Sequence, residues 1–147
     1  MNKKLKFKII TPEREVFSDE IDQVSLMTTD GEITILPEHI PLVSILQSGE
    51  LKYKKDGKEV LLAVSGGFVE VKDDNSVYIL ADTAEMAGEI DVDRAKEAID
   101  RAKKTMEEIR NEEEIDFTAL KADLQRAMNR LKIGKKYKKL PQANITK

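Results

Sequence analysis

A change in hydrophobic periodicity at residues 90–95, Ile-Asp-Val-Asp-Arg-Ala, divides this chain into two parts. Before this stretch, apolar residues alternate with polar ones or form short runs between glycine turns, as they do in β-strands. After it, apolar residues recur every three or four positions, which is the spacing of an amphipathic helix. A β half therefore precedes a helical half, and Asp91 is predicted to cap the first helix.

The first 87 residues have the pattern of many short strands. Residues 4–11 alternate apolar and lysine side chains, which predicts a strand with one solvated face. Asp30-Gly31 and Asp56-Gly57 each lie between two β-type runs, a strong signal for hairpins. Gly66-Gly67 is predicted to interrupt two further strands. Eight to ten strands without a helix-length insert predict a β-sandwich or flattened barrel, not parallel βαβ units.

The helical half shows two apolar seams. The first comprises Val92, Ala95, Ile99, Ala102, Met106 and Ile109, and the second comprises Phe117, Leu120, Leu124, Ala127 and Leu131. An acidic break at 111–114 separates them, Asp116 is a candidate cap, and Gly134 is predicted to end the second helix before a basic tail at 135–139. Matching seams with a short connection predict an antiparallel helical hairpin. Several seam residues are small, so we expect the hairpin to lean on another surface and to be able to open.

The amino-acid composition limits the kinds of functional site that this chain can form. The chain has no cysteine and one histidine, which excludes disulfides and thiolate metal sites and leaves a histidine-based relay short of partners. No apolar run approaches membrane-spanning length, and the basic start Met1-Asn-Lys-Lys lacks the apolar core of a signal peptide, so we expect a cytoplasmic protein. Residues 1–87 carry a net charge of −6 and residues 88–147 carry +3, so the halves are expected to have different partners.

Five motifs in one order carry a resemblance to a known family. They are Gly31-Glu32-Ile33, Pro37-Glu38-His39-Ile40-Pro41-Leu42, Val64-Ser65-Gly66-Gly67-Phe68, Ile90-Asp91-Val92-Asp93-Arg94-Ala95 and Arg126-Ala127-Met128-Asn129-Arg130-Leu131. Over essentially its whole length the chain resembles the epsilon subunit of bacterial F-type ATP synthases, of the ATP-binding type found in bacilli. The resemblance implies a ten-stranded β-sandwich at residues 1–87, a regulatory helical hairpin at 88–134 and a basic tail at 135–147.

The resemblance also implies a regulatory ATP site in the hairpin. Residues 90–95 match the motif Ile/Leu-Asp-x-x-Arg-Ala at every specified position. The implied ATP-binding set is Glu85, Ile90, Asp91, Arg94, Ala95, Arg101, Arg126 and Arg130. Four guanidinium groups suit a triphosphate, since each presents a planar pair of donors to phosphate oxygens. Mg²⁺ is compatible with this site but is not required by the sequence. No metal site, no catalytic residue and no glycine-rich phosphate loop is expected, so the chain should sense ATP without hydrolysing it.

The implied function is that of a non-catalytic subunit in the central stalk of the proton-translocating ATP synthase. The sandwich would link the gamma subunit to the c-ring through Gly31, Glu32 and His39. With ATP the hairpin would fold against the sandwich; without ATP it would extend into the alpha/beta catalytic head and inhibit ATP hydrolysis. We expect no nucleic acid partner, and a peripheral location on the cytoplasmic side of the cell membrane, with membrane contact only through the complex.

Other interpretations remain open from the residues alone. Asp91–Arg94 and Glu97–Arg101 have the spacing of ordinary intrahelical ion pairs, so the arginines need not bind a ligand. Glu32 fits a solvated turn acid, and His39 fits a loop residue without a special role. The alternatives to the regulatory function are a rotor subunit without ATP sensing, a nucleotide-using enzyme, and an unrelated protein or nucleic acid binder that uses the tail at 135–139.

Overall fold

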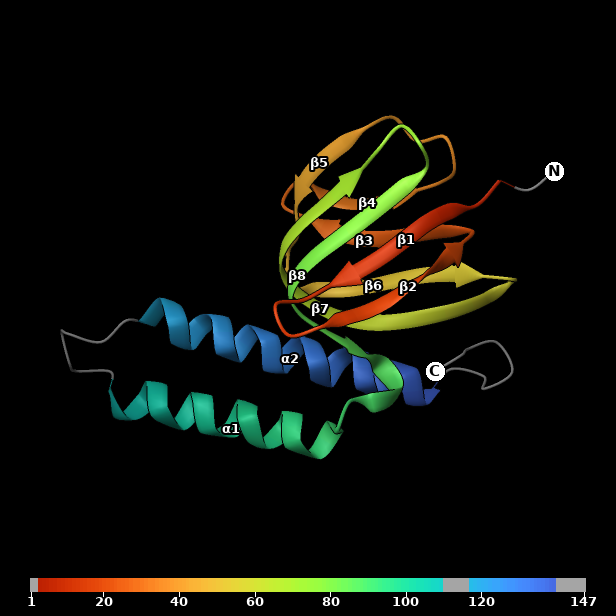
Figure 1. Ribbon diagram of the computed structural model, residues 1–147. Helices are drawn as coiled ribbons and strands as arrows, with labels where there is room; N and C mark the ends of the chain where they lie inside the picture. The colour runs from red at the N-terminus through yellow and green to blue at the C-terminus, as the bar shows by residue number, and fades with distance from the viewer. Residues whose placement is uncertain (1–2, 110–116, 140–147) are drawn as a thin grey trace.

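The computed structural model describes residues 3–109 and 117–139, which form a β-sandwich followed by two long helices (Figure 1). The strands are β1 (Leu5–Ile10), β2 (Glu15–Ile21), β3 (Gln23–Thr28), β4 (Gly31–Ile35), β5 (Leu42–Ile45), β6 (Gly49–Lys55), β7 (Lys58–Val71) and β8 (Ser76–Met86). A short 3₁₀ turn, η1 (Ala87–Glu89), leads to α1 (Val92–Glu108) and α2 (Phe117–Lys139). The predicted order of a sandwich and then a helical hairpin is confirmed.

The described residues contain eight strands, which agrees with the eight to ten predicted from the residue pattern but is fewer than the ten that the family resemblance implies, and β7 supplies part of the reason. The prediction that Gly66-Gly67 interrupts two strands is wrong, because β7 runs through both glycines. Gly67 has a φ of +103°, and a Cβ there would lie 1.8 Å from the carbonyl oxygen of Leu80 on β8. Only glycine allows the two backbones to approach this closely, so the pair bends a single long strand instead of ending it.

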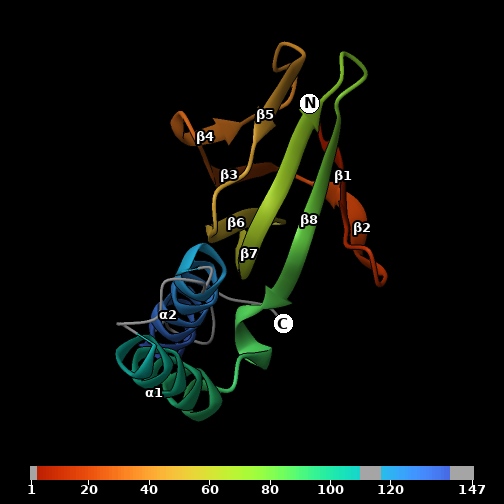
Figure 2. The ribbon, with the colours of Figure 1, turned by 90° about the vertical axis from the view of Figure 1, so that its left-hand side faces the viewer.

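The strands form one sheet that folds over on itself. Its order is β2-β1-β8-β7-β6-β3-β4, and β5 pairs with the far half of β7. All pairs are antiparallel except β1–β8, and the hairpins predicted at residues 30–31 and 56–57 join β3 to β4 and β6 to β7. Figure 2 shows β3, β4 and β5 facing β1 and β2 across the sandwich. The rings of Phe7, Phe17 and Tyr53, with centroids 4.7 to 5.9 Å apart, join β1 and β2 to β6.

The space between the layers is filled by alternating strand residues, as the period-two pattern predicts. Leu5, Phe7 and Ile9 are all buried, while the lysines between them face outward or lie at the margin. Burial raises the pKa of Tyr53 to about 12, with a smaller contribution from the charge of Asp19. Eighteen buried hydrophobic residues make one continuous core inside the sandwich.

The first helical seam is confirmed, but its burial declines along the helix. Val92, Ala95 and Ile99 are buried, whereas Ala102, Met106 and Ile109 are only partly covered. In the second seam Ala127 is buried, and Leu120, Leu124 and Leu131 are partly buried. The predicted cap Asp116, the acidic break at 111–114, the Phe117 side chain and the tail beyond residue 139 lie outside what the structure describes.

The prediction that Gly134 ends the second helix is wrong. α2 continues through Gly134 to Lys139, so the basic segment 135–139 is helical. A Cβ at Gly134 would lie 2.9 Å from Val92 Cγ2 and 3.0 Å from Ile90 Cγ2. Gly134 therefore serves close packing against the start of α1, a use of glycine that sequence alone does not separate from a helix stop.

The two helices differ in how they contact the sandwich. α2 packs against β6, β7 and η1, and α1 packs mainly on α2 (Figures 1 and 2). In the described part of the chain no helix is long and apolar enough to cross a membrane.

Candidate functional site

The sandwich and the hairpin meet at residues 85–95. β8 ends at Met86, η1 follows, and α1 begins at Val92 with Asp91 as its N-cap. The Asp91 carboxylate accepts a hydrogen bond from the backbone N–H of Arg94 at 3.1 Å, which confirms the predicted cap. Ile90 and Ala95 are buried on either side of it. The motif that marks the domain junction is thus also the first turn of the hairpin.

An ion pair joins α2 to the end of the sandwich. Arg130 Nε and Nη2 donate to the two carboxylate oxygens of Glu85 at 2.7 and 2.9 Å. The hydrogen bond to Glu85 raises the pKa of Arg130 above its ordinary value, burial opposes this shift, and the charge of Asp91 adds to it. Glu85, Asp91 and Arg130 therefore share one electrostatic environment at the junction, although they come from β8, the cap and α2.

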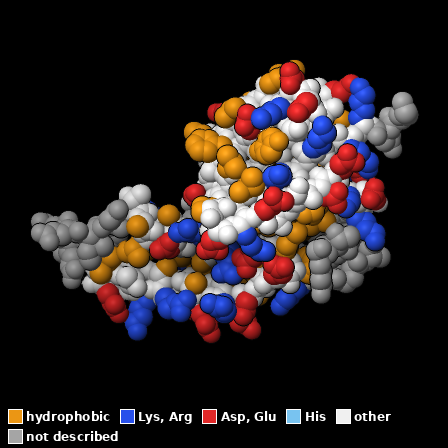
Figure 3. All heavy atoms as spheres, viewed as in Figure 1, with side chains coloured by type: hydrophobic (Ala, Val, Ile, Leu, Met, Phe, Trp, Pro, Cys, Tyr) orange, Lys and Arg blue, Asp and Glu red, His pale blue; other side chains and the backbone are white. Residues whose placement is uncertain are grey.

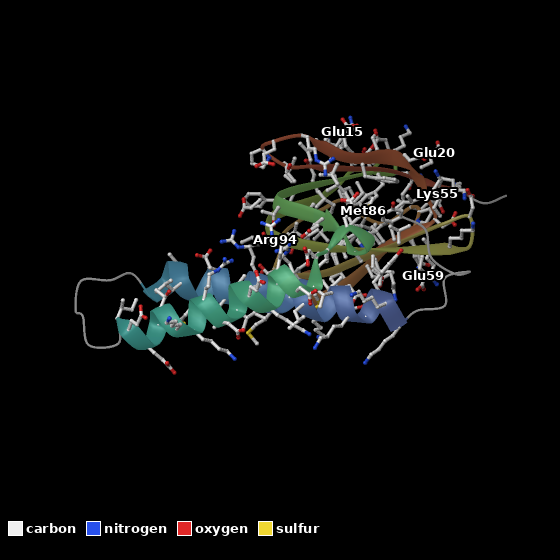
Figure 4. The ribbon with its side chains drawn as sticks, turned by 90° about the horizontal axis from the view of Figure 1, so that it is seen from below. Glu15, Glu20, Lys55, Glu59, Met86 and Arg94 are labelled. Atoms are coloured by element: carbon white, nitrogen blue, oxygen red, sulfur yellow. The ribbon has the colours of Figure 1, made fainter. Side chains whose placement is uncertain are left out.

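The other three arginines of the predicted ATP-binding set differ in whether they form ion pairs. Arg126 pairs with Asp123 one turn earlier on α2. Within the described residues, Arg94 and Arg101 form no ion pair, although Asp91 and Glu97 stand at suitable spacings. Figure 4 shows Arg94 projecting sideways from the start of α1. The two guanidinium groups on α1 are thus available to an anion, whereas those on α2 already have carboxylate partners.

α2 docks on the sandwich through its last turns. Ile133, 1% exposed, is buried against a small cluster formed by Leu61, Ala63, Ala87 and Ile90, and Tyr137 packs at its edge. The Tyr137 ring lies over Gly88, where an added Cβ would be 3.1 Å from the ring. Sequence reasoning ended the helix at Gly134 and assigned Tyr137 to a basic tail, so it missed this contact; the only signal was that Ile133 and Tyr137 stand four residues apart.

Ion pairs flank this apolar contact on both sides. The Lys136 ammonium group donates to both oxygens of Glu50 on β6 at 2.8 and 2.9 Å. Glu50, Ala63 and Glu85 are aligned across β6, β7 and β8 by the strand registers. α2 therefore crosses the sheet over Ala63. The carboxylates on either side, Glu50 and Glu85, pair with Lys136 and Arg130 of the helix.

The residues predicted for the c-ring and gamma interface lie at opposite ends of β4, with Gly31 and Glu32 at its start and His39 beyond its end. Gly31 and Glu32 open β4, which is the last strand of the sheet, and Glu32 is exposed. His39 lies in the loop between Pro37 and Pro41, half-buried, with its Nδ1 2.7 Å from the carbonyl oxygen of Ile40.

An exposed apolar row crosses the outer face of β5, β7 and β8. Ile45, Phe68 and Leu80 are neighbours in the strand register and are 53%, 52% and 45% exposed. Val43 continues the row along β5, and Figure 3 shows hydrophobic side chains gathered on the upper part of the sandwich. A contiguous patch of this kind marks an interaction surface. Sequence reasoning did not single it out, because both faces of these strands carry apolar residues.

No group of three or more potential metal-ligating side chains occurs among residues 3–109 and 117–139. The features that the fold does present are a docked helical hairpin, a polar junction and an apolar face. An exposed apolar face of this kind is typical of a protein that binds other proteins.

Comparison with known proteins agrees with this class. The family description "ATP synthase, Delta/Epsilon chain, beta-sandwich domain" matches residues 4–87, and its "long alpha-helix domain" matches residues 89–135. The ATP synthase epsilon chain of Dehalococcoides mccartyi is 48% identical over 139 residues, covering 95% of this chain and 98% of that protein. The epsilon chain of Halalkalibacterium halodurans is 45% identical over 130 residues, covering 88% and 96%.

A chain of the Euglena gracilis mitochondrial ATP synthase shares the fold with a TM-score of 0.64 at 21% identity, covering 92% of this chain and 79% of that one. The chain studied here belongs to the ATP synthase delta/epsilon chain family, and the relatives that it matches over nearly their whole length are epsilon chains, which are non-catalytic subunits of the ATP synthase complex.

Proposed function

We propose that this subunit senses ATP and regulates ATP hydrolysis through the position of its helical hairpin. The observation that carries the proposal is the polar junction at which Arg130 of α2 bridges to Glu85 of the sandwich beside Asp91. A ligand that engages α1, α2 and this junction together is favoured only when the hairpin is docked. ATP shifts the position of the hairpin by its difference in affinity for the docked and undocked forms.

The arginines of this set and Asp91 suit the binding of a nucleoside triphosphate. Arg94 and Arg101 lie seven residues apart, hence two turns or about 10 Å along α1, and neither has an ion pair in the described part of the chain. Arg126 and Arg130 of α2, which pair with Asp123 and Glu85, would supply two more guanidinium groups by exchanging these carboxylates for phosphate oxygens. Bidentate donation from these side chains suits phosphate oxygens. The Asp91 carboxylate and the backbone near Ile90 and Ala95 offer acceptors for an adenine amino group.

A weak contact between the hairpin and the sandwich would allow ATP to change the position of the hairpin. α1 reaches the sandwich mainly through α2, and the contact of α2 rests on one small cluster and two ion pairs. Released from the sandwich, the hairpin would present Arg126, Arg130 and Lys136 to acidic surfaces of the alpha/beta catalytic head and inhibit hydrolysis.

The sandwich surfaces support docking to the rotor. The exposed row of Ile45, Phe68 and Leu80 suits a large apolar partner surface, for which we propose the gamma subunit. Glu32 at the open edge suits basic loops of the c-ring, with His39 near both partners. Similar folds occur in structures of ATP synthase assemblies that contain F1 and the c-ring, in Euglena gracilis, and the central stalk and c-ring, in Tetrahymena thermophila. The subunit would then lie on the cytoplasmic side of the cell membrane.

The test is titration of the full chain with ATP by calorimetry and small-angle scattering. We expect saturable binding, a smaller radius of gyration and weaker binding of GTP. Arg101→Gln should weaken ATP binding by about tenfold, since it removes one charged hydrogen-bond donor group, whereas the matched variant Lys104→Gln on the same helix should bind as the parent does. Absence of saturable ATP binding would leave a rotor subunit without ATP sensing.

A further inference from the structure

A half-enclosed hollow of about 360 Å³ lies between α2 and the outer face of β3 and β6. Its lining includes Ser48 and Lys52 from the sandwich, with Asn129, Lys132 and Lys136 from α2. None of the four arginines of the proposed ATP set lines it. The hollow is therefore a separate feature, and it exists only while α2 is docked.

One face of α2 supplies the helical wall. Asn129, Lys132, Ile133 and Lys136 are spaced by three or four residues, so they share this face. Ile133 is buried against the sheet, and the Asn129 side-chain amide donates to the carbonyl oxygen of Gly49 at 3.3 Å. These two contacts fix the helix, and with it the lysines, at the rim of the hollow.

The charges around the hollow favour an anion. Three lysines and two carboxylates line it. Lys136 and Glu50 neutralise each other in a two-point contact. Lys52 and Lys132 form no ion pair with any described residue, and Glu32 at the edge of the sheet is the remaining acid. Two lysines without an ion pair in the described part of the chain, one from each wall, thus line the same hollow together with Ser48.

We propose that this hollow binds a phosphate dianion, either free or as part of a small phosphorylated metabolite, between Lys52 of the sandwich and Lys132 of α2. Because the two walls come from different parts of the chain, the bound anion holds the hairpin in its docked position. The site would give the subunit a second input, distinct from the ATP set and independent of whether that set binds ATP.

The experiment is titration of the full chain with inorganic phosphate at constant ionic strength, balanced with chloride, followed by calorimetry and amide hydrogen exchange of α2. We expect saturable binding and slower exchange in α2. Lys52→Gln and Lys132→Gln should each weaken binding by about tenfold, since each removes a charged donor. Lys58→Gln, an exposed lysine of β7 away from the hollow, is the matched control and should leave binding unchanged.

Two further experiments determine where the anion binds and in which chemical form. Arg101→Gln should retain phosphate binding; its loss there would assign the phosphate to the ATP set and overturn the proposal. Glycerol 3-phosphate in place of inorganic phosphate distinguishes the sources: tighter binding that still depends on Lys52 and Lys132 supports a phosphorylated metabolite, and weaker binding supports the free anion. Equal effects of phosphate and chloride, or unchanged binding in both lysine variants, would also overturn it.

Discussion

The sandwich and the hairpin of this chain are held together by very different amounts of buried surface. Eighteen buried hydrophobic residues fill the sandwich, whereas five form the cluster on which α2 docks. Among the described residues of α1 and α2, the buried hydrophobic side chains between the helices are those of Val92, Ala95, Ile99 and Ala127. Because hydrophobic stabilisation scales with buried apolar area, we expect release of the hairpin from the sandwich to cost less free energy than unfolding of the sandwich. The proposed regulatory function requires this difference.

The largest effect is expected inside the sandwich. Leu62 is fully buried on β7, and Leu62→Ala should lower the free energy of unfolding by about 2–5 kcal/mol, because it removes transfer free energy and leaves a cavity. Urea denaturation followed by circular dichroism measures the change. Met128→Ala on α2, where Met128 is 52% exposed, is the control. A similar, small loss in both variants would contradict the comparison between the two parts.

A second variant should separate the parts without unfolding the sandwich. Gly134→Val places side-chain carbon within about 3 Å of the methyl groups of Val92 and Ile90, as the Cβ distances of 2.9 and 3.0 Å show. Overpacking of this kind costs about 1–3 kcal/mol. We expect faster amide exchange in α1 and α2 and a larger radius of gyration, with exchange in the sandwich core unchanged.

The control is Ala122→Val, which makes the same type of change on the exposed side of α2. If Gly134→Val leaves the exchange of both helices as it is in Ala122→Val, then close packing at Gly134 does not hold the hairpin in place.

The ion pair at the junction should have a smaller effect. The side chains of Arg130 and Glu85 are 33% and 29% exposed, so solvent screens their interaction. A double-mutant cycle with Arg130→Gln and Glu85→Gln should give a coupling free energy of about 1 kcal/mol or less. Protection of α2 against amide exchange is the measurement. A coupling near zero would show that the pair of Arg130 and Glu85 does not help to dock the helix.

The smallest effect concerns acid stability of the sandwich. The hydrogen bond from Lys4 lowers the pKa of Asp22 below its ordinary value of 3.8. The native state therefore releases this proton more readily than the unfolded state does. The contribution of Asp22 is fully present above about pH 4 and is lost as the pH falls through the lowered native pKa.

Stability curves between pH 2 and pH 6 should accordingly be flatter at the acid end for Asp22→Asn than for the parent. Asp73→Asn changes an exposed acid that has no ion pair within the described residues, and it should follow the parent curve. Parallel curves for the parent and Asp22→Asn would contradict this role of the Lys4 contact.

Local patterns predicted much of this molecule. The alternation at residues 4–11 placed Leu5 and Phe7 in the core, and the Asp-Gly pairs placed two hairpins, because strand side chains alternate and tight turns need particular backbone angles. Asp91 was identified as a helix cap because it precedes an apolar helical seam. These features depend on neighbours within a few residues, which the sequence displays directly.

The candidate site was predictable only in part. The family motif brought Glu85, Asp91 and Arg130 forward, and the structure places them in one electrostatic environment. Spacing did not reveal that Arg130 is already paired with a residue 45 positions away, or that Arg94 and Arg101 lack the intrahelical pairs their spacing allows. Partners of long side chains depend on which surfaces meet.

The sequence by itself determined the order of the two parts, the strand and helix periodicities, and the position of the junction at Asp91. Only the tertiary structure decided that Gly67 bends a strand and that Gly134 lies within a helix, since a missing Cβ matters through whatever approaches it. It also turned the basic segment at 135–139 into the last turns of a docked helix. Periodicity can be read from a single segment, whereas close backbone approach and ion pairing depend on which two segments meet in the folded chain.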